Sequence, residues 1–299
     1  MENITHIPVM LKEVLHYLNL SAGKIIVDAT VGVGGHSLAI IEKILPNGRL
    51  ICIDRDEESL SVAQTRLSGF SGSCEFVHGN FMDISTILNQ MNIRKIDGIL
   101  FDLGVSRFQL ENPQRGFSFQ TEGPLDMRMD RTSYISAYDL VNNLNQEELS
   151  ALLWNFGQER WHNRIASFLV KERQSHPITT TLELSDIVFK AIPPRYKNRY
   201  YRIHPATKTF QAMRIAVNRE LEALQIALKD VIDYLNPNAR ICVISFHSLE
   251  DRIVKFSFRE SCSKGKLKII TPKPIVCMRS EIKINPSSRS AKLRVAERI

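Results

Sequence analysis

Short apolar runs alternate with amphipathic stretches through the first hundred residues, and this alternation restricts the fold more than any other feature of the sequence. Four runs have the length and aliphatic composition of buried strands: residues 25–28, 50–54, 74–77 and 96–101. Helical patterns precede and separate them, over residues 10–20, 36–45 and 57–67. Apolar strands separated by helices form parallel sheets with right-handed crossovers. The sequence therefore predicts an α/β fold with a mostly parallel sheet.

Beyond residue 130 the pattern turns helical and later returns to strands. Helical periodicity runs over residues 137–190, and one long helix is predicted over 207–234. Three more strand patterns follow, at residues 241–246, 267–271 and 292–297. The economical arrangement is one seven-stranded sheet domain that an all-helical domain interrupts after the fourth strand. Its three segments are the first part of the sheet domain, a loop with the helical insertion, and a second part with a basic end, at residues 1–104, 105–205 and 206–299.

Composition narrows the class of protein and its compartment. The chain has 299 residues, of which 43% are hydrophobic and 24% charged, as in soluble globular proteins. It begins without a basic segment followed by an apolar core, and no apolar run approaches the ~20 residues of a membrane helix. Its five cysteines form no C-x-x-C pair. We therefore expect a cytoplasmic protein without a membrane partner.

The positive charge of the chain is unevenly distributed. The formal net charge is +7, yet residues 255–299 contain 12 Lys and Arg against 3 Asp and Glu. The other residues contain 27 basic and 29 acidic side chains, so all of the positive excess lies in the last sixth of the chain. Such an asymmetry indicates a polyanionic partner, with a solvated basic tail as the alternative.

Residues 102–130 form a polar, turn-rich stretch directly after the fourth strand pattern. A segment of this length without periodicity is uncommon in a compact domain unless it is functional or disordered. Its aromatic residues and methionines argue against disorder. Ligands of open α/β sheets bind at the carboxyl ends of strands, where this segment begins. We therefore expect it to form the wall of a functional site.

A glycine-rich turn, residues 28–35 (DATVGVGG), follows the first strand pattern. Gly34 and Gly35 precede a predicted helix, where a ligand can approach the backbone closely. Asp54 closes the second strand and is placed to accept hydrogen bonds from ribose hydroxyls. The dinucleotide fingerprint requires a third glycine where this chain has Ser37, and no Walker lysine is present.

The cofactor follows from the acids around this turn. Asp28, at the end of the first strand, suits a cationic ligand, so the predicted cofactor is S-adenosyl-L-methionine. Phe81 follows the third strand and has two interpretations, a packing partner for the adenine or an ordinary core aromatic. His36 is either a polar contact to the ligand or a surface residue.

Chemistry is expected where the fourth strand ends, at Asp102. Asp102, Gly104 and Ser106 offer side-chain and backbone acceptors for the protons of an exocyclic base amine, which a site must align with the methyl donor. Gln109 can hold either the cofactor or the base. The eight histidines lack metal-ligand spacing, so no metal is predicted.

Two other segments attract attention. Residues 245–252 (SFHSLEDR) leave the fifth strand with His247, two serines and acids, at the same expected edge of the sheet. Residues 195–202 (RYKNRYYR) combine four cations with three tyrosines, which suits single-stranded RNA. The alternative for the second segment is a basic surface loop.

Several motifs together resemble the bacterial 16S ribosomal RNA cytosine-N4 methyltransferases, nearly end to end. The motifs that carry the resemblance are VGGHS at 33–37, IDRD at 53–56, DLGVS at 102–106, RGFSF at 115–119, GPLDMRMD at 123–130, HPATKTFQAMR at 204–214 and SFHSLEDRIV at 245–254. The resemblance implies a class I, Rossmann-like methyltransferase fold with an inserted helical domain. It also implies N4-methylation of a single cytidine near the decoding centre, in 16S rRNA or in the small ribosomal subunit.

Site residues follow from the resemblance by position. The implied cofactor contacts are Gly34, Gly35, His36, Asp54, Phe81, Asp102 and Gln109. Asp102, Ser106 and His247 are the expected catalytic residues. The sequence departs from the family pattern at Arg107-Phe108, where Ser-Pro is expected, and at Ser287, where Arg is expected. These departures concern details of RNA contact.

Two other functions stay open on the sequence alone. A DNA amino-methyltransferase is disfavoured because Leu103-Gly104-Val105 follows Asp102 where a Pro-Pro-aromatic signature is usual. A non-catalytic RNA-binding ribosome factor is disfavoured by the intact glycines, Asp54 and Asp102. The oligomeric state also stays open, with a homodimer among the alternatives.

Overall fold

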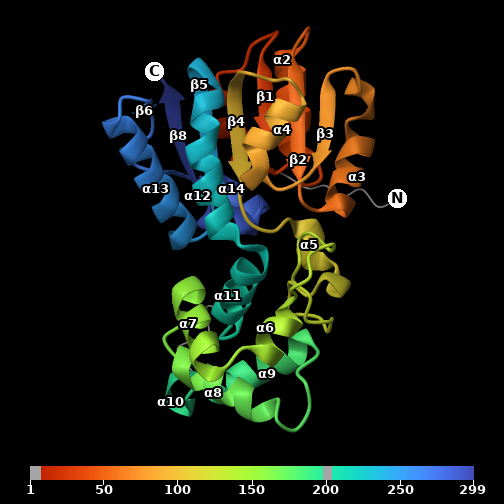
Figure 1. The fold of residues 1–299 in the computed structure, drawn as a ribbon, viewed down its shortest axis with the longest axis vertical. Coiled ribbons are helices and arrows are strands. Elements are labelled where there is room, and N and C mark those ends of the chain that lie inside the picture. Colours follow the sequence, from red (N-terminus) through yellow and green to blue (C-terminus); the bar gives the residue numbers. More distant parts are fainter. Residues whose placement is uncertain (1–7, 198–203) are drawn as a thin grey trace. The chain divides into compact units, whose positions relative to one another are not determined.

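The computed structural model describes residues 8–197 and 204–299, which fall into two compact units (Figure 1). The first unit comprises the described residues up to Gly104 and Leu221–Ile299, and the second lies within Val105–Glu220. The first boundary coincides with the expected one after residue 104. The chain returns to the first unit at Leu221 and not at residue 206, because the helix that follows residue 206 packs on helices of the second unit.

Within the described residues, eight strands form the single sheet of the first unit. They are β1 (Ile25–Asp28), β2 (Arg49–Asp54), β3 (Cys74–His78), β4 (Ile96–Asp102), β5 (Leu235–Ser245), β6 (Leu267–Ile269), β7 (Ile275–Val276) and β8 (Lys292–Arg298). Their order is β3-β2-β1-β4-β5-β8-β6, with β7 paired to β8. β1 to β5 pair in parallel, whereas β8 runs antiparallel to its three neighbours. The predicted α/β class with a mostly parallel sheet is confirmed.

Two predicted elements were wrong in detail. β7 adds an eighth strand where seven were predicted, because two residues are too short to show a period. The single helix predicted over 207–234 is broken into α11 (Thr207–Asn218), α12 (Glu220–Asp230) and a short 3-10 helix, η5 (Val231–Tyr234). Arg219, at φ 49°, separates α11 from α12, since a left-handed residue ends a helix.

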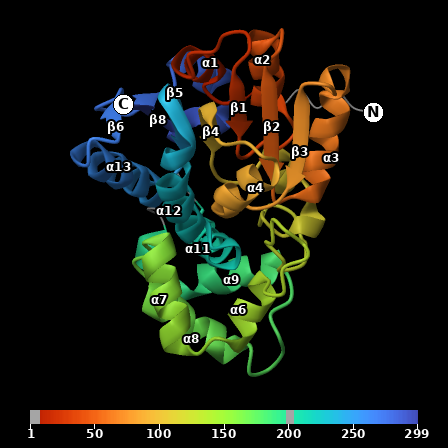
Figure 2. The same cartoon turned by 45° about the horizontal axis from the view of Figure 1, so that its top comes forward.

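Helices cover both faces of the sheet, and Figure 2 shows the two layers. One layer consists of α1 (Leu11–Tyr17), α2 (Gly35–Ile44), α3 (Glu57–Arg66) and, near the C-terminal strands, α14 (Arg279–Ile284). The other consists of α4 (Ile84–Gln90), α12 and α13 (Ser248–Ser263). Successive residues of β2 alternate between the layers: Ile51 and Ile53 pack on the α12 side, Leu50 and Cys52 on the α2 side. Burial on both faces explains why the strands read as continuous apolar runs.

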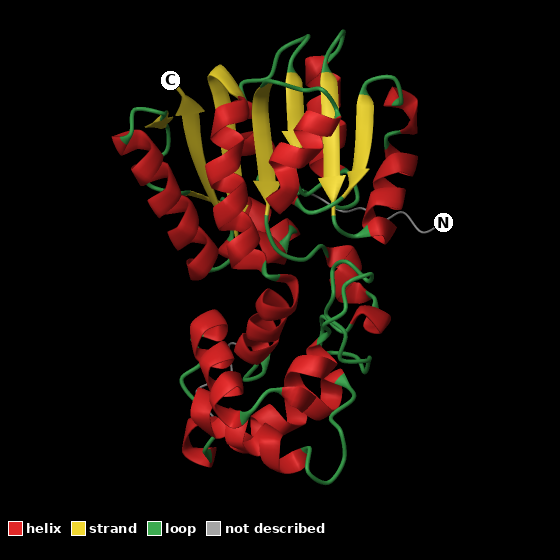
Figure 3. Cartoon of the chain, in the orientation of Figure 1, coloured by secondary structure: helices red, strands yellow, loops and turns green. Residues whose placement is uncertain are grey.

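Helices build the second unit, in agreement with the expected helical insertion, and Figure 3 shows all strand arrows in the first unit. They are α5 (Arg107–Glu111), α6 (Ala137–Asn143), α7 (Gln146–Gly157), α8 (His162–Glu172), α9 (Thr181–Ala191), α10 (Pro194–Lys197) and α11. Their apolar faces form a separate core around residues such as Leu149, Leu153 and Ile165. In the part of the chain that the structure describes, no helix is both long and apolar enough to cross a membrane.

The irregular stretch after Gly104 is packed against this helical core. Arg115 is 1% exposed and donates to the carbonyl oxygens of Arg128 and Met129, at 3.1 and 2.9 Å. Asn218 of α11 donates to the carbonyl oxygen of Met127 at 2.7 Å and accepts the N–H of Met129 at 2.8 Å. Buried side chains therefore replace the backbone ladder that a helix or strand would supply.

Candidate active site

Three carboxylates end adjacent strands at one edge of the sheet. Asp28, Asp54 and Asp102 are the last residues of β1, β2 and β4. β1 pairs in parallel with both β2 and β4, so the three carboxyl ends meet at the same edge. Open α/β sheets bind ligands at this edge. The structure thus brings together the residues that the sequence placed at separate strand ends.

The turn between β1 and α2 presents its backbone at this edge. Gly32 and Gly34 have φ angles of 52° and 80°, in the left-handed region that favours glycine. Gly34 is the N-cap of α2, and Gly35 is its first residue. Asp54 holds the turn, because its two oxygens accept the N–H groups of Gly32 and Asp56 at 2.7 and 2.8 Å. A Cβ on Gly32 would meet no atom within 4 Å, so the space beside this backbone is open to a ligand.

Asp28 has a different role from the one expected. It is 1% exposed, and its oxygens accept the hydroxyl of Ser37 at 2.7 Å and the N–H of Thr30 at 3.3 Å. Asp28 is thus buried between the turn and α2 and holds one hydrogen bond on each oxygen, where the sequence suggested a contact to a cationic ligand. Thr30 in turn accepts the N–H of Asp102 through Oγ1 at 2.7 Å. Asp28 therefore helps to position Asp102, and the sequence signal for this role was only its place at a strand end.

His36 connects the turn to Asp102. It is 6% exposed, which excludes the interpretation as a surface residue. Its Nε2 lies 2.9 Å from the carbonyl oxygen of Val9, and its Nδ1 lies 3.5 Å from Oδ2 of Asp102. Because a carbonyl only accepts, Nε2 carries a hydrogen, and Nδ1 faces the carboxyl group of Asp102.

Burial makes the carboxyl groups of this edge weaker acids than usual. It raises the pKa of Asp28 to about 6 and that of Asp54 to about 6. Burial also raises the pKa of Asp102 well above its ordinary value, and the negative charges of Asp28 and Glu250 add to the shift. The charged form of each group is disfavoured because it loses its hydration.

Oδ1 of Asp102 is buried and has no hydrogen-bond partner among the described residues. A buried polar atom without a partner costs about 1–3 kcal/mol, so this oxygen indicates a ligand that donates to it. S-adenosylmethionine fits the arrangement around it. The open backbone beside Gly32 admits the ligand, and each oxygen of Asp54 keeps a lone pair for a ribose hydroxyl.

Glu250 is a residue of this edge that the sequence interpretation missed. It is 2% exposed, and its Oε2 accepts the N–H groups of Phe246 and His247 at 2.8 and 3.2 Å. His247 is the N-cap of α13, where its Nδ1 accepts the N–H of Glu250 at 3.4 Å. Its Nε2 lies 3.2 Å from Oε1 of Glu250 without the alignment of a hydrogen bond. The structure therefore gives His247 a capping role, and the only sequence signal for Glu250 was its place after the fifth strand.

Phe81 lies in the hydrophobic core next to β4. Its ring is 9% exposed and meets Phe101 edge to face, with centroids 5.6 Å apart. The guanidinium of Arg55 lies 5.7 Å from the centre of the same ring. These contacts favour the core-aromatic interpretation of Phe81, and its contact with adenine stays a prediction.

Ser106 and Gln109 belong to the second unit, so the structure does not group them with the other site residues. They form the capping box of α5: Ser106 Oγ accepts the N–H of Gln109 at 3.2 Å, and Gln109 Oε1 accepts the N–H of Ser106 at 2.9 Å. Their roles with cofactor and base stay predictions.

The Tyr- and Arg-rich segment at 195–202 is described only as far as Lys197, and the rest lies outside the described residues. In that part the guanidinium groups of Arg195 and Arg160 lie 4.8 and 5.6 Å from the ring centre of Tyr196. Elsewhere, the described residues contain no group of three or more His, Cys, Asp or Glu that could hold a metal ion.

Known proteins resemble this chain over its length. Residues 3–299 match the family model described as the MraW methylase family. A protein of Halothermothrix orenii named Ribosomal RNA small subunit methyltransferase H is 48% identical over 311 residues, 99% of either chain. Its namesake in Persephonella marina is 50% identical over 296 residues, 99% of this chain and 100% of the other. The namesake in Clostridioides difficile is 45% identical over 309 residues, 98% of this chain and 99% of the other.

The fold and the family match agree. The mostly parallel sheet with helices on both faces is a class I methyltransferase fold, and its cofactor is S-adenosyl-L-methionine. The family predicted from the motifs is confirmed. The chain is a methyltransferase and belongs to the MraW methylase family.

Proposed function

We propose that this protein methylates the exocyclic N4 amine of one cytidine of 16S ribosomal RNA near the decoding centre. The names of its full-length relatives support an RNA of the small subunit as substrate. The main support for an amine as the methylated group comes from Asp102. Its buried Oδ1 lacks a hydrogen-bond partner among the described residues and suits an N–H donor. The motif resemblance supports cytosine as the base and N4 as the position.

Asp102 and His36 perform the acid–base part of this reaction. An exocyclic amine is a weak nucleophile because its lone pair is delocalised into the ring. Oδ1 of Asp102 accepts one amine hydrogen and thereby orients the nitrogen. The raised pKa of Asp102 makes its carboxylate a better acceptor for the proton that N4 loses, and His36 Nδ1 faces the other oxygen at 3.5 Å. When bound, S-adenosylmethionine supplies an electrophilic methyl group on sulfur.

The other predicted site residues complete the proposal. The backbone of Gly34 and Gly35 approaches the cofactor, and Asp54 holds its ribose. His36, Phe81 and Gln109 are further proposed cofactor contacts.

Ser106 and His247 are proposed to act on the substrate. His247→Asn tests the second of them, because Asn keeps the N-cap of α13 while it removes the imidazole. Full activity of this variant would remove His247 from the reaction.

Methyl transfer to defined substrates tests the function. Small subunits from a strain lacking the gene are incubated with protein and S-adenosylmethionine, and their nucleosides are analysed by mass spectrometry. We expect N4-methylcytidine in assembled subunits, with less in naked 16S rRNA and none in DNA oligonucleotides of the same sequence. Absence of N4-methylcytidine from both RNA substrates would refute the proposal, and modification of the DNA alone would favour the DNA alternative.

The cellular location and the oligomeric state of the protein are part of the same proposal. A small-subunit substrate places the protein in the cytoplasm. Light scattering of the purified protein checks whether it forms a homodimer.

A further inference from the structure

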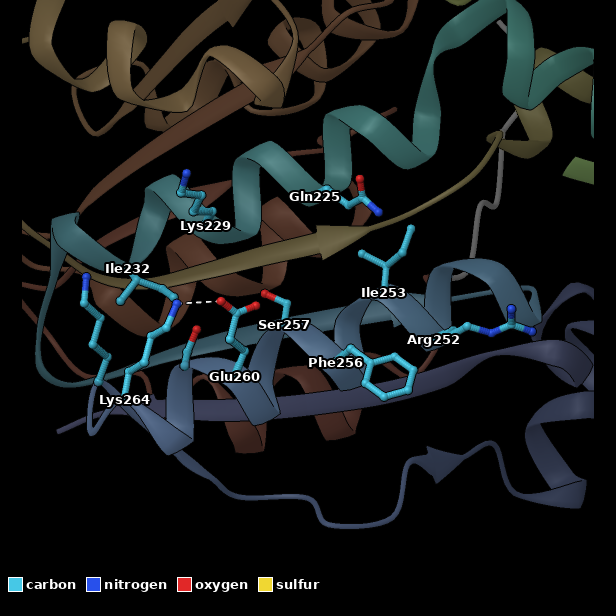
Figure 4. Close-up of a pocket in the computed structure, with 11 residues that line it drawn as sticks. Gln225, Lys229, Ile232, Arg252, Ile253, Phe256, Ser257, Glu260 and Lys264 are labelled. Carbon is cyan, nitrogen blue, oxygen red and sulfur yellow. Dashed lines mark hydrogen bonds and ion pairs between the residues drawn. The ribbon is translucent and has the colours of Figure 1, made fainter. Parts of the chain in front are cut away.

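A groove runs between α12 and α13 on one outer face of the first unit (Figure 4). Its volume is about 500 Å³. Gln225 and Lys229 of α12 form one wall, and Arg252, Phe256 and Glu260 of α13 form the other. The groove therefore belongs to one unit and does not depend on how the two units are placed.

Cations dominate this α12–α13 groove. Lys229, Arg252, Lys264 and Lys266 line it, against a single acid, Glu260. Glu260 is paired with Lys264 at 2.5 Å, and Lys266 is paired with an aspartate of η5 at 3.0 Å. In the described part of the chain, neither Lys229 nor Arg252 lies within ion-pair distance of an acid. The hydrogen bond and charge of Lys264 lower the pKa of Glu260, and the charge of Lys229 adds to this shift. Lys229 and Arg252 can therefore also contact an anionic partner.

The exposed face of α13 extends the same pattern. Three side chains follow Arg252 at intervals of three, four and seven residues, so all four lie on one face of the helix; they are Lys255, Phe256 and Arg259. Phe256 is 57% exposed, and the ammonium of Lys255 lies 5.8 Å from its ring centre. This face alternates positive charge with an aromatic ring that is open to solvent.

The groove starts close to the edge that carries Asp102. β5 pairs in parallel with β4, with Ile244 opposite Asp102, and α13 begins three residues after Ser245 ends β5. From there α13 runs for 16 residues, about 24 Å, away from that edge. A chain whose target base enters the site at Asp102 can continue along this helix.

We propose that the α12–α13 groove binds single-stranded RNA next to the methylated cytidine, through its phosphates and one stacked base. The inference rests on the proposed function, since it extends the path of the same substrate. Spaced cations with an open aromatic ring are typical of proteins that follow a single strand without reading its sequence. An acidic peptide would leave the exposed ring of Phe256 without a stacking partner.

The salt dependence of RNA binding tests the phosphate contacts. Fluorescence anisotropy follows a fluorescein-labelled, unstructured single-stranded RNA in increasing KCl, with wild type and with the double variant Lys229→Gln/Arg252→Gln. Each phosphate contact to a single strand contributes about 0.7 to the slope of log K against log salt. We therefore expect the double variant to bind more weakly and its slope to be smaller by about 1.4.

A matched control removes the same charge from the other side of the sheet. Lys12→Gln/Lys43→Gln changes two exposed lysines of α1 and α2, and it is expected to keep the slope within about 0.3 of wild type. Equal slopes for the groove variant and this control would overturn the proposal. A groove that binds an acidic protein in place of RNA would give the same result.

Phe256 tests the stacked base. Since its side chain is mostly exposed, Phe256→Ser should keep the melting temperature, while its affinity for the labelled RNA falls about tenfold. An unchanged affinity would exclude the stacking. Neither binding assay requires methyl transfer. Failure of the proposed reaction can therefore be distinguished from failure of RNA binding in the groove.

Discussion

Asp102 shows how one side chain can be prepared for a ligand by its surroundings. The backbone of this residue is held by Thr30, its Oδ2 faces His36, and its Oδ1 is buried without a partner. Burial next to Asp28 and Glu250 raises its pKa. We propose that a bound ligand supplies the hydrogen bond that Oδ1 lacks in the protein alone.

Asp102→Asn is expected to separate catalysis from folding. The amide keeps the shape but cannot take a proton, so kcat should fall by about 10²–10⁴-fold. The melting temperature should not fall, because a buried carboxyl with a raised pKa is replaced by a neutral group. Kinetics and thermal unfolding measure both, with Asp83→Asn, at an exposed position of the same unit, as the control. Wild-type kcat in Asp102→Asn would exclude Asp102 from the reaction.

Cofactor affinity should rise with pH between 5 and 7. In the cofactor-free protein the pKa of Asp54 is about 6, so its carboxyl group is half protonated near that pH. Ribose hydroxyls donate to the ionised carboxylate, so binding releases protons and strengthens as the pH rises through 6. Titration calorimetry in buffers of different ionisation enthalpy detects both effects. An affinity that is flat or falls over this range would contradict the assignment.

The segment from residue 105 to residue 130 shows what holds an element without regular structure. Arg115 donates to two of its carbonyl groups, and Asn218 anchors it to α11. Gly123 allows a close approach, because a Cβ there would lie 1.9 Å from the carbonyl oxygen of Pro113. The fold of this segment depends on a few buried side chains.

Asn218→Ala should therefore destabilise the second unit. The change removes both side-chain hydrogen bonds to Met127 and Met129 and leaves two buried backbone groups without partners. We expect a loss of about 2–4 kcal/mol in the free energy of unfolding, measured by urea denaturation. Asn155→Ala, on an exposed face of α7, is the control and should change it by less than about 0.5 kcal/mol. Equal effects of the two substitutions would show that Asn218 is no anchor.

The whole molecule consists of two units with separate hydrophobic cores. The cores of the first unit pack on the sheet, and that of the second lies among α6 to α9 and α11. Both units are moderately basic: residues 105–220 contain 16 Lys and Arg against 12 Asp and Glu, and the first unit contains 23 against 20. Within the first unit the basic side chains are concentrated from Lys255 onward.

Cofactor binding should stabilise the two units unequally. Hydrogen exchange with mass spectrometry is expected to show protection of the turn at residues 30–36 and of the ends of β2 and β4. The backbone amides of α7 and α8 should exchange at the same rate with and without S-adenosylmethionine, since these helices belong to a separate hydrophobic core. Equal protection of both regions would indicate a single cooperative unit.

Most of the sheet and half of the site could be predicted from the sequence. β1 to β4 and the turn at Gly34 carry strong local signals, namely apolar runs and glycines before a helix. The break at Arg219 could not be predicted, because the left-handed end of a helix is usually marked by glycine or asparagine and here the residue is an arginine. Glu250 could not be assigned either, since its burial depends on β5 and α13 packing side by side.

The sequence by itself determined the α/β class, the family and the strand ends at which the acids lie. These properties follow from periodicity and short motifs, which act within a few residues of each other. Only the tertiary structure decided that Asp28 is buried with hydrogen bonds inside the protein, that His36 faces Asp102, and that one oxygen of Asp102 lacks a hydrogen-bond partner among the described residues. Those properties arise between residues far apart in the chain, where burial and the competition for hydrogen-bond partners are settled by packing.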